Sequence, residues 1–171
     1  MFIFSVVREQ AKEAGKIVRS LGPELIVSSD LQRARETAEI VSGFLDGVQI
    51  VLEPKIRERV CGRAEGLTAD EILKEYGFRM EMTSRSLDSV PGAEPYNDFA
   101  GRVVEAFNAM YDRYGSRKIL SVCHGGVMRT FYNEQIKPIP AGMVFRNCSI
   151  ISTERVGERW NILERYNTEN I

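Results

Sequence analysis

Short apolar runs alternate along the chain with segments of helical periodicity. Phe2–Val7 is an apolar run typical of a buried strand, and in Arg8–Leu21 the apolar residues recur every three or four positions, as on one face of a helix. Gly22-Pro23 ends that helix. Leu25–Val27 and Lys118–Cys123 predict further buried strands. The pattern therefore begins as strand, helix, strand.

The remaining blocks continue this alternation. Ser28-Ser-Asp30 offers short oxygen side chains typical of a helix N-cap, and a helix is expected from there to about Phe44. Glu53–Pro95 is polar and irregular apart from one short helix, and such a long loop region is usually functional. The alternation predicts an α/β fold in a single domain, a mostly parallel sheet with helices on both faces. The other expected elements are strands at Val48–Leu52, Met143–Thr153 and Trp160–Arg165, and helices at Ala69–Tyr76, Asn97–Tyr114 and Val127–Glu134.

Composition narrows the class of protein. The 171 residues, 43% of them hydrophobic, fit one domain spanning 1–171, and a net charge of −1 gives no reason to expect nucleic acid or an acidic membrane as a partner. No apolar stretch reaches membrane-spanning length. Cys61, Cys123 and Cys148 form an odd set without CxxC spacing, which favours reduced thiols and a cytoplasmic protein. Neither a metal site nor a cofactor is expected.

His124, the only histidine of the chain, is the first candidate for chemistry. It follows the apolar run that ends at Cys123 and precedes Gly125 and Gly126. Ligands of parallel sheets bind at the carboxyl ends of strands, and a helix that starts there offers free amides to an anion. The alternative is a core histidine hydrogen-bonded to a carbonyl.

Arg33 and Glu58 are the next candidates. Arg33 lies in the first turn of the helix after Ser28-Ser-Asp30, where a guanidinium can bind phosphate with two hydrogen bonds. Glu58 lies in a loop crowded with arginines, so its carboxyl is expected to keep a low pKa and stay ionised; burial or a bound phosphate would raise that pKa and improve it as a general acid. The alternatives are a solvated helix arginine and plain surface charge pairing.

Six segments, in the correct order and covering almost the whole chain, resemble the histidine phosphatase superfamily, which includes the phosphoglycerate mutases and many small phosphatases. The second-histidine motif of that family is similar to Ser121-Val-Cys-His-Gly-Gly-Val-Met-Arg129. The other similar segments are Arg8–Gly15, Ser28–Ala38, Glu58–Thr68, Pro91–Glu94 with Asp98–Val103, and Asn147–Ser149.

The resemblance implies a role for each candidate. His124 would be the second histidine of the site, Arg33 the second phosphate-binding arginine and Glu58 the donor of a proton to the leaving oxygen. Gly125 and Gly126 would let a phosphate approach the backbone. The expected partner is a small phosphorylated metabolite or inorganic phosphate, and a small phosphatase is favoured over a glycolytic mutase because the chain leaves little room for a substrate-closing insertion.

The chain departs from the family at its front. The first strand of the family runs into an Arg-His-Gly motif whose histidine is phosphorylated, whereas here Val7 is followed by Arg8-Glu9-Gln10. One interpretation places Arg8 and Glu9 in the motif positions. The other, which we favour, is that the nucleophile loop is deleted between Val7 and Arg8 and that Arg8 belongs to the first helix. Exchange of the first strand between subunits, giving a homodimer, stays open.

Three hypotheses follow for function. The first is an active phosphomonoester hydrolase or mutase in which His124 is the nucleophile or Glu58 activates water. The second, which we favour, is a catalytically impaired member, a pseudoenzyme that keeps the fold and a phosphate-binding pocket, because losing the covalent step slows the reaction by orders of magnitude. The third is an active protein whose nucleophile loop is missing only from this chain.

Overall fold

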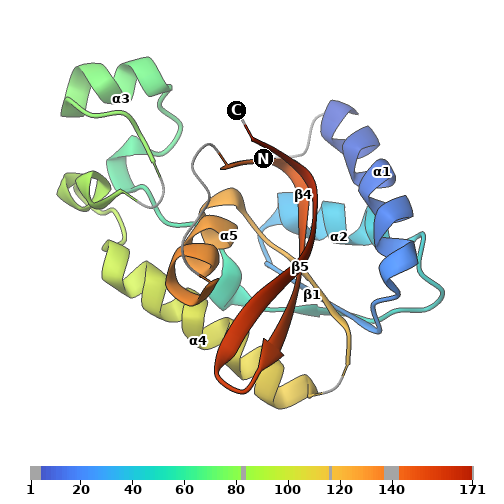
Figure 1. Ribbon diagram of the computed structural model, residues 1–171. Coiled ribbons are helices and arrows are strands. Elements are labelled where there is room, and N and C mark those ends of the chain that lie inside the picture. Colours follow the sequence, from blue (N-terminus) through green and yellow to red (C-terminus); the bar gives the residue numbers. More distant parts are fainter. Residues whose placement is uncertain (1–4, 82–83, 116, 137–142, 171) are drawn as a thin grey trace.

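The computed structural model describes residues 5–81, 84–115, 117–136 and 143–170 of the chain (Figure 1). Helices and strands alternate over the first four fifths, and the chain then closes with two long strands, β4 and β5. The helices are α1 (Ser5–Leu21), α2 (Gln32–Ser42), α3 (Ala69–Tyr76), α4 (Tyr96–Tyr114) and α5 (Gly125–Phe131), and the strands are β1 (Leu25–Ser28), β2 (Ile50–Leu52), β3 (Ile119–Val122), β4 (Met143–Val156) and β5 (Arg159–Asn170).

Two separate sheets form the strand layer of the described residues. The first is parallel, in the order β2-β1-β3, and the second is the antiparallel hairpin β4-β5. Ser28 at the end of β1 pairs in register with Val122 at the end of β3. The residues that follow these two strands therefore meet at one edge of the parallel sheet. This is the α/β fold that the alternation of the sequence predicts.

The main core lies where α4 and α5 pack on the parallel sheet. The apolar stripe of α4 supplies Phe99 and Val103, which are fully buried, and these pack with Leu25 and Val27 of β1 and with Val127 of α5. The periodicity of three and four that predicted α4 thus reflects a real buried face. Helices α1 and α2 pack against each other at the other side of the molecule (Figure 1).

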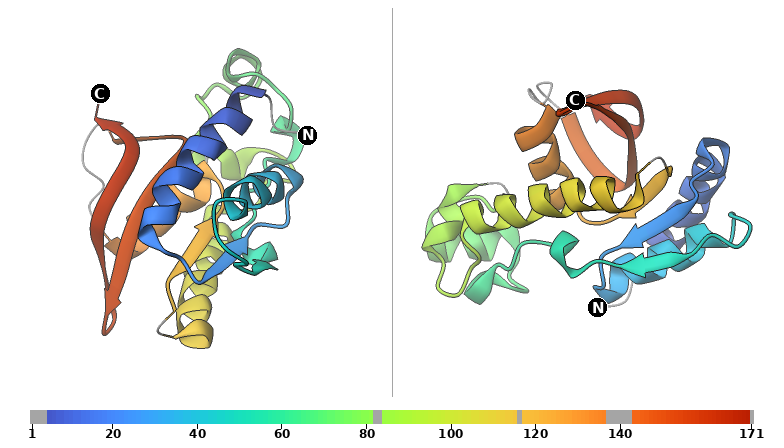
Figure 2. Two further views of the ribbon diagram at one scale, coloured as in Figure 1. Left: turned by 90° about the vertical axis from the view of Figure 1, so that its right-hand side faces the viewer. Right: turned by 90° about the horizontal axis from the view of Figure 1, so that it is seen from below.

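A second, smaller core stabilises the segment around α3. This core consists of buried residues from the long irregular region. Residues 60–81 and 84–93, which pack around it, are called the α3 lobe below. Figures 1 and 2 show this lobe at the end of the molecule opposite α1. A reciprocal capping box between Thr68 and Glu71 starts α3, and Gly77 in a left-handed conformation ends it. The core residues are Cys61, Ala64, Ile72, Leu87 and Val90.

The predicted first strand, Phe2–Val7, is wrong where the structure describes it. Residues 5–7 form the first turn of α1, and residues 2–4 lie outside the described residues. Val7 stands four positions before Ala11 and so extends the face that Ala11, Ala14 and Val18 bury. Arg8 lies within this continuous helix and forms an ion pair with Glu36 of α2 at 3.0 Å. Arg8 therefore belongs to the first helix.

The predicted cap of α2 also differs. Leu31 occupies the N-cap position and makes no capping bond with its side chain. Instead the Ser29 hydroxyl accepts a hydrogen bond from the Leu31 amide at 3.3 Å, while the Asp30 carboxylate faces Arg57. The side-chain oxygens of Ser29 and Asp30 therefore bind the Leu31 amide and Arg57, and neither residue occupies the N-cap position that was expected of this segment.

Candidate active site

His124 lies directly after β3, and its side chain turns towards the end of β1. The residue is 7% exposed, and Ser29, which follows β1, is fully buried beside it. The two are joined by a contact of 2.9 Å between His124 Nε2 and Ser29 Oγ. A lone imidazole is therefore held at the carboxyl edge of the parallel sheet, where the strand order predicts a ligand site.

Arg33 contacts the other nitrogen of the same ring. Its Nε donates to His124 Nδ1 at 3.3 Å. A guanidinium nitrogen can only donate, so Nδ1 offers its lone pair and a neutral ring carries its proton on Nε2. The Nε2–H then donates to Ser29 Oγ. Arg33 and His124, 91 positions apart in the sequence, are thus brought together as the resemblance implies.

Burial, together with the charges of Arg33 and Arg102, lowers the pKa of His124 from 6.5 to about 3. The imidazole is therefore neutral at physiological pH. This agrees with the hydrogen bonds, because a doubly protonated ring would turn an N–H towards the Arg33 guanidinium.

The half-buried carboxylate of Glu58 lies at the start of α5. Its Oε2 accepts from the Gly126 amide at 3.0 Å, and its Oε1 accepts from the Arg59 amide at 3.0 Å. Burial raises the pKa of Glu58, and this effect outweighs the two amides and the charges of Arg33 and Arg102, which lower it. The expectation of a low pKa is therefore wrong, and the burial that would favour a general acid is present.

The loop arginines expected around Glu58 point to other partners. Arg57 forms two hydrogen bonds with the Asp30 carboxylate, the one from Nε at 2.6 Å. Arg59 is almost fully buried and pairs with Asp88, and it also donates to the carbonyl oxygens of Glu94 and Ser84, both at 2.8 Å. Arg59 therefore fixes the α3 lobe to the body of the protein, and its guanidinium is not exposed to a ligand.

Gly125 and Gly126 occupy different environments. A Cβ built on Gly125 would meet no atom within 4 Å, so the backbone there lies open. Gly126 is buried, and its amide donates to Glu58. Ligand access to the backbone is thus available at Gly125, whereas the Gly126 amide already has an acceptor.

Two residues of the cluster are not identified as site residues by the sequence. The sequence predicts a capping role for Ser29, and it places Arg102 only in the segment leading into α4. Arg102 donates to the Glu58 carbonyl at 3.2 Å and to the Glu94 carboxylate. A glutamate and an arginine eight positions apart, as Glu94 and Arg102 are, can indicate an ion pair. Such pairs are too common on protein surfaces to identify a site.

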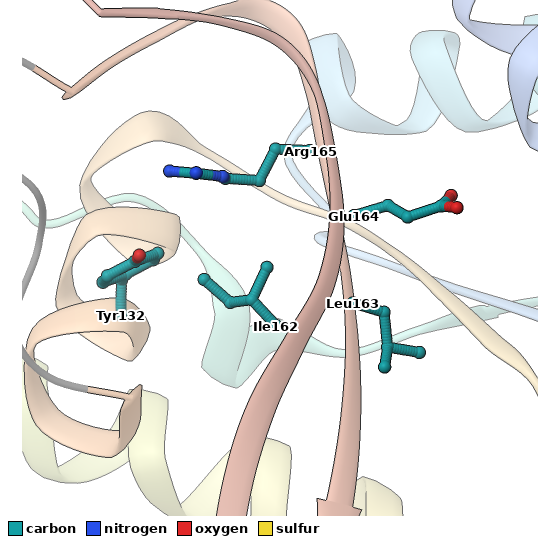
Figure 3. Close-up of a pocket in the computed structure, with 5 residues that line it drawn as sticks. All are labelled: Tyr132, Ile162, Leu163, Glu164 and Arg165. Carbon is teal, nitrogen blue, oxygen red and sulfur yellow. The ribbon is translucent and has the colours of Figure 1, made fainter.

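A pocket of about 570 Å³ opens between Tyr132 and β5 (Figure 3), away from the residues around His124. Tyr132, Ile162 and Arg165 lie on one side of β5, while Leu163 and Glu164 point to the opposite side. This follows from the register shift opposite Ser152 and Thr153, which leaves one residue of β5 unpaired. Among the residues that line this pocket, Arg165 is the only positively charged one, and its side chain does not converge with other polar groups on one point.

In the part of the chain that the structure describes, no group of three or more histidine, cysteine, aspartate or glutamate residues is able to hold a metal ion. None of the helices in these segments is long and apolar enough to cross a membrane.

Comparison with known proteins gives the cluster a context. The chain is 29% identical over 155 residues to the uncharacterized phosphatase PhoE of Bacillus subtilis (strain 168), covering 90% of this chain and 75% of that one. It is 31% identical over 159 residues to the probable phosphoglycerate mutase GpmB of Salmonella paratyphi C, covering 89% and 73%. The solved structure of YhfR from Bacillus stearothermophilus superposes with a TM-score of 0.75 at 26% identity, covering 91% and 79%.

The family model described as histidine phosphatase superfamily (branch 1) matches residues 6–168. This range contains all of α1 except its first residue, together with the parallel sheet, the α3 lobe and most of the hairpin. The chain belongs to the histidine phosphatase superfamily, within its group of phosphatases and phosphoglycerate mutases.

Proposed function

We propose that this protein binds a phosphomonoester or inorganic phosphate at His124, Arg33 and Glu58, and that it is impaired in the phosphohistidine reaction of its family. The observation that carries the proposal is the contact between Arg33 and His124 at the ends of β1 and β3. It places a fixed positive charge and a neutral imidazole side by side where an anion can enter. Relatives named phosphatase and phosphoglycerate mutase support phosphoryl chemistry as the class of reaction.

Each residue has a defined task in this proposal. The Arg33 guanidinium binds two phosphate oxygens, for which its planar fork is suited. The open backbone at Gly125 admits the phosphate beside the Glu58 carboxylate, which the Gly126 amide holds. Glu58, whose raised pKa favours the protonated form, donates a proton to the leaving oxygen.

The impairment follows from the single imidazole. A nucleophilic histidine must offer a lone pair to phosphorus, and the Nδ1 lone pair of His124 accepts from Arg33 while Nε2 carries the proton. The chain contains no second histidine to take the phosphoryl group. Without that covalent step, binding and electrostatic stabilisation remain, and these alone support a reaction slower by orders of magnitude.

A slow hydrolase that uses His124 itself is the second candidate. The observation in its favour is the length of the Arg33–His124 contact, 3.3 Å, which is longer than an ordinary N–H hydrogen bond. A bound phosphate competes for the guanidinium and frees Nδ1. The two candidates differ in one measurable product, phosphohistidine, which only the second forms.

Binding is tested by titrating vanadate or phosphate calorimetrically into protein of verified mass. Loss of a charged, bidentate contact costs about 1.5–3 kcal/mol, so Arg33→Ala should weaken binding by roughly 10-fold to 100-fold. Arg35→Ala is the matched control, an exposed arginine two positions along the same helix. The double variant Arg33→Ala with His124→Ala should not bind, and unchanged binding would show that the pocket is misplaced.

Catalysis is tested with p-nitrophenyl phosphate, beside His124→Ala. We expect turnover no higher than that of the variant and no phosphohistidine trapped by acid quench after a labelled phosphodonor. Clear turnover that the variant loses would establish the slow hydrolase and refute the impairment.

The cellular setting and the assembly are also proposals. A cytoplasmic location is supported by Cys61, Cys123 and Cys148, since none of the three forms a disulfide in the structure. A homodimer is tested by light scattering on the purified chain, with a mass of about twice 19.4 kDa as the positive result.

A further inference from the structure

Arg102 of α4 forms a closely held ion pair with Glu94. Its Nε donates to Glu94 Oε1 at 2.6 Å and its Nη2 donates to Oε2 at 2.8 Å, so the pair is bidentate. Both side chains are largely shielded from water, at 21% and 17% exposure. Pairs of this geometry and burial are held far more firmly than exposed ones.

The same guanidinium also holds the loop that leads to Glu58. Nη1 donates to the carbonyl oxygens of Lys55 at 2.7 Å and Arg57 at 2.8 Å, and Nη2 reaches the carbonyl of Glu58 at 3.2 Å. One side chain therefore fixes three carbonyl groups over four residues. A lysine ammonium keeps the charge but cannot present donors in this planar arrangement.

Glu94 holds the loop from the other side of Glu58. Its amide donates to the Val60 carbonyl at 2.9 Å, and its carboxylate accepts from the Val60 amide at 3.3 Å. The backbone before Glu58 is thus fixed by Arg102 and the backbone after it by Glu94. Arg102 and Glu94 are also paired with each other. The backbone of Glu58 is therefore held on both sides by two residues that are themselves connected.

The Glu58 carboxylate reaches its neighbours only from this backbone position. Its contacts at 3.0 Å with the Gly126 amide and with the Arg59 amide leave little freedom, because a small displacement of the loop lengthens the first of them beyond hydrogen-bond range. We propose that Arg102, held by Glu94, is a positioning residue that fixes the Glu58 carboxylate against the start of α5, beside His124. This inference rests on the proposed role of Glu58 as proton donor.

The charge of Arg102 adds an electrostatic effect to the mechanical one. It lowers the pKa of Glu58 and that of His124, acting on both groups from one place. The residue therefore sets where the acid stands and also moderates how strongly burial raises its pKa. A side chain that only joined α4 to the loop would leave the titration of Glu58 unchanged.

The test follows the Gly126 amide by ¹H–¹⁵N NMR in the full chain without ligand. In the parent protein we expect its shift to titrate with Glu58 and its hydrogen exchange to be slow. In Arg102→Lys and Glu94→Gln we expect exchange at Gly126 to accelerate by roughly tenfold or more, as for loss of a hydrogen bond to a charged group, and the titration midpoint to move. Glu105→Gln is the matched control, since Glu105 pairs with Lys55 in an exposed contact of the same helix.

The outcomes separate a positioning role from plain instability. Protection of the Ile26 amide in the parallel sheet reports whether a variant is folded. Folded variants with an unchanged Gly126 titration and exchange rate would overturn the inference. The proposed function is judged independently, by the response of the His124 ring resonance to added phosphate in the parent protein. No response would refute phosphate binding at this site, whereas the Gly126 measurement would still show whether Arg102 positions Glu58.

Discussion

The pH dependence of stability gives a sharp test of how His124 is buried. The perturbation is the replacement His124→Gln, which removes the only imidazole of the chain while keeping a neutral polar side chain. The folded protein holds this ring neutral with a pKa of about 3, whereas an unfolded chain protonates it with the ordinary value of 6.5.

The sign of the effect follows from proton binding. Below pH 6.5 the unfolded state takes up a proton that the folded state does not, so stability falls as the pH falls towards 3. At about 1.4 kcal/mol per pH unit, the interval from 6.5 to about 3 corresponds to roughly 5 kcal/mol in all. Between pH 7.5 and pH 5.0 the expected loss from His124 alone is about 2 kcal/mol.

Glu58 acts in the opposite direction. Its folded pKa is raised above the ordinary 4.5, so the folded state binds a proton more readily and stability is lost as the pH rises through the folded pKa. The His124→Gln substitution is therefore also made in a Glu58→Gln background, where this opposing contribution is absent.

The assay is urea unfolding followed by far-ultraviolet circular dichroism at pH 7.5, 6.5, 5.5 and 5.0. The free energy of unfolding of the parent should fall by about 2 kcal/mol more than that of the His124→Gln variant over this range. A difference that stays constant within about 0.5 kcal/mol would refute the reasoning. So would a ring proton of His124 that titrates near pH 6.5 in the folded protein.

Two further predictions concern the α3 lobe, and both are measured by urea unfolding. Arg59→Met should cost about 3–5 kcal/mol, because it leaves Asp88 and two carbonyl groups without their buried partner, whereas the exposed Arg63→Met should change stability by less than about 0.5 kcal/mol. Gly62→Ala should cost more than about 2 kcal/mol, since φ is +58° and the added methyl would fall on the main chain of residues 91–93. Gly66→Ala, at φ +82° with no atom within 4 Å, should cost about 1 kcal/mol, and equal losses at the two glycines would contradict the steric argument.

Much of the fold follows from periodicity because the buried faces are regular. The stripe through Phe99 and Val103 predicts α4 to within one residue at its start, and the short helix expected near Ala69–Tyr76 is present there. Residues 5–7 show the limit of this reasoning. A short apolar run fits a strand as well as a helix, and only the spacing from Val7 to Ala11 distinguishes the two.

The sequence indicates which residues to examine as candidates, but not their electrostatics. His124 follows β3 and Arg33 lies in the first turn of the helix after β1, both of which the sequence predicts, and the structure brings the two side chains into contact. The pKa of Glu58 differs from the expectation because burial raises it, while the arginines near it in sequence are paired elsewhere, Arg57 with Asp30 and Arg59 with Asp88. Which partner a long charged side chain selects depends on distant parts of the fold, and local sequence does not record it.

The separation of the two sheets has a thermal consequence. No strand of the hairpin pairs with the parallel sheet in the segments described, so the hairpin is held by side-chain packing, in which the Trp160 ring lies edge-on to Phe131 at 5.1 Å and to Tyr111 at 5.9 Å. Apolar association of this kind weakens on cooling, unlike a ladder of backbone hydrogen bonds. Trp160 is the only tryptophan of the chain, so its fluorescence at low temperature reports whether the hairpin stays packed against α4 and α5.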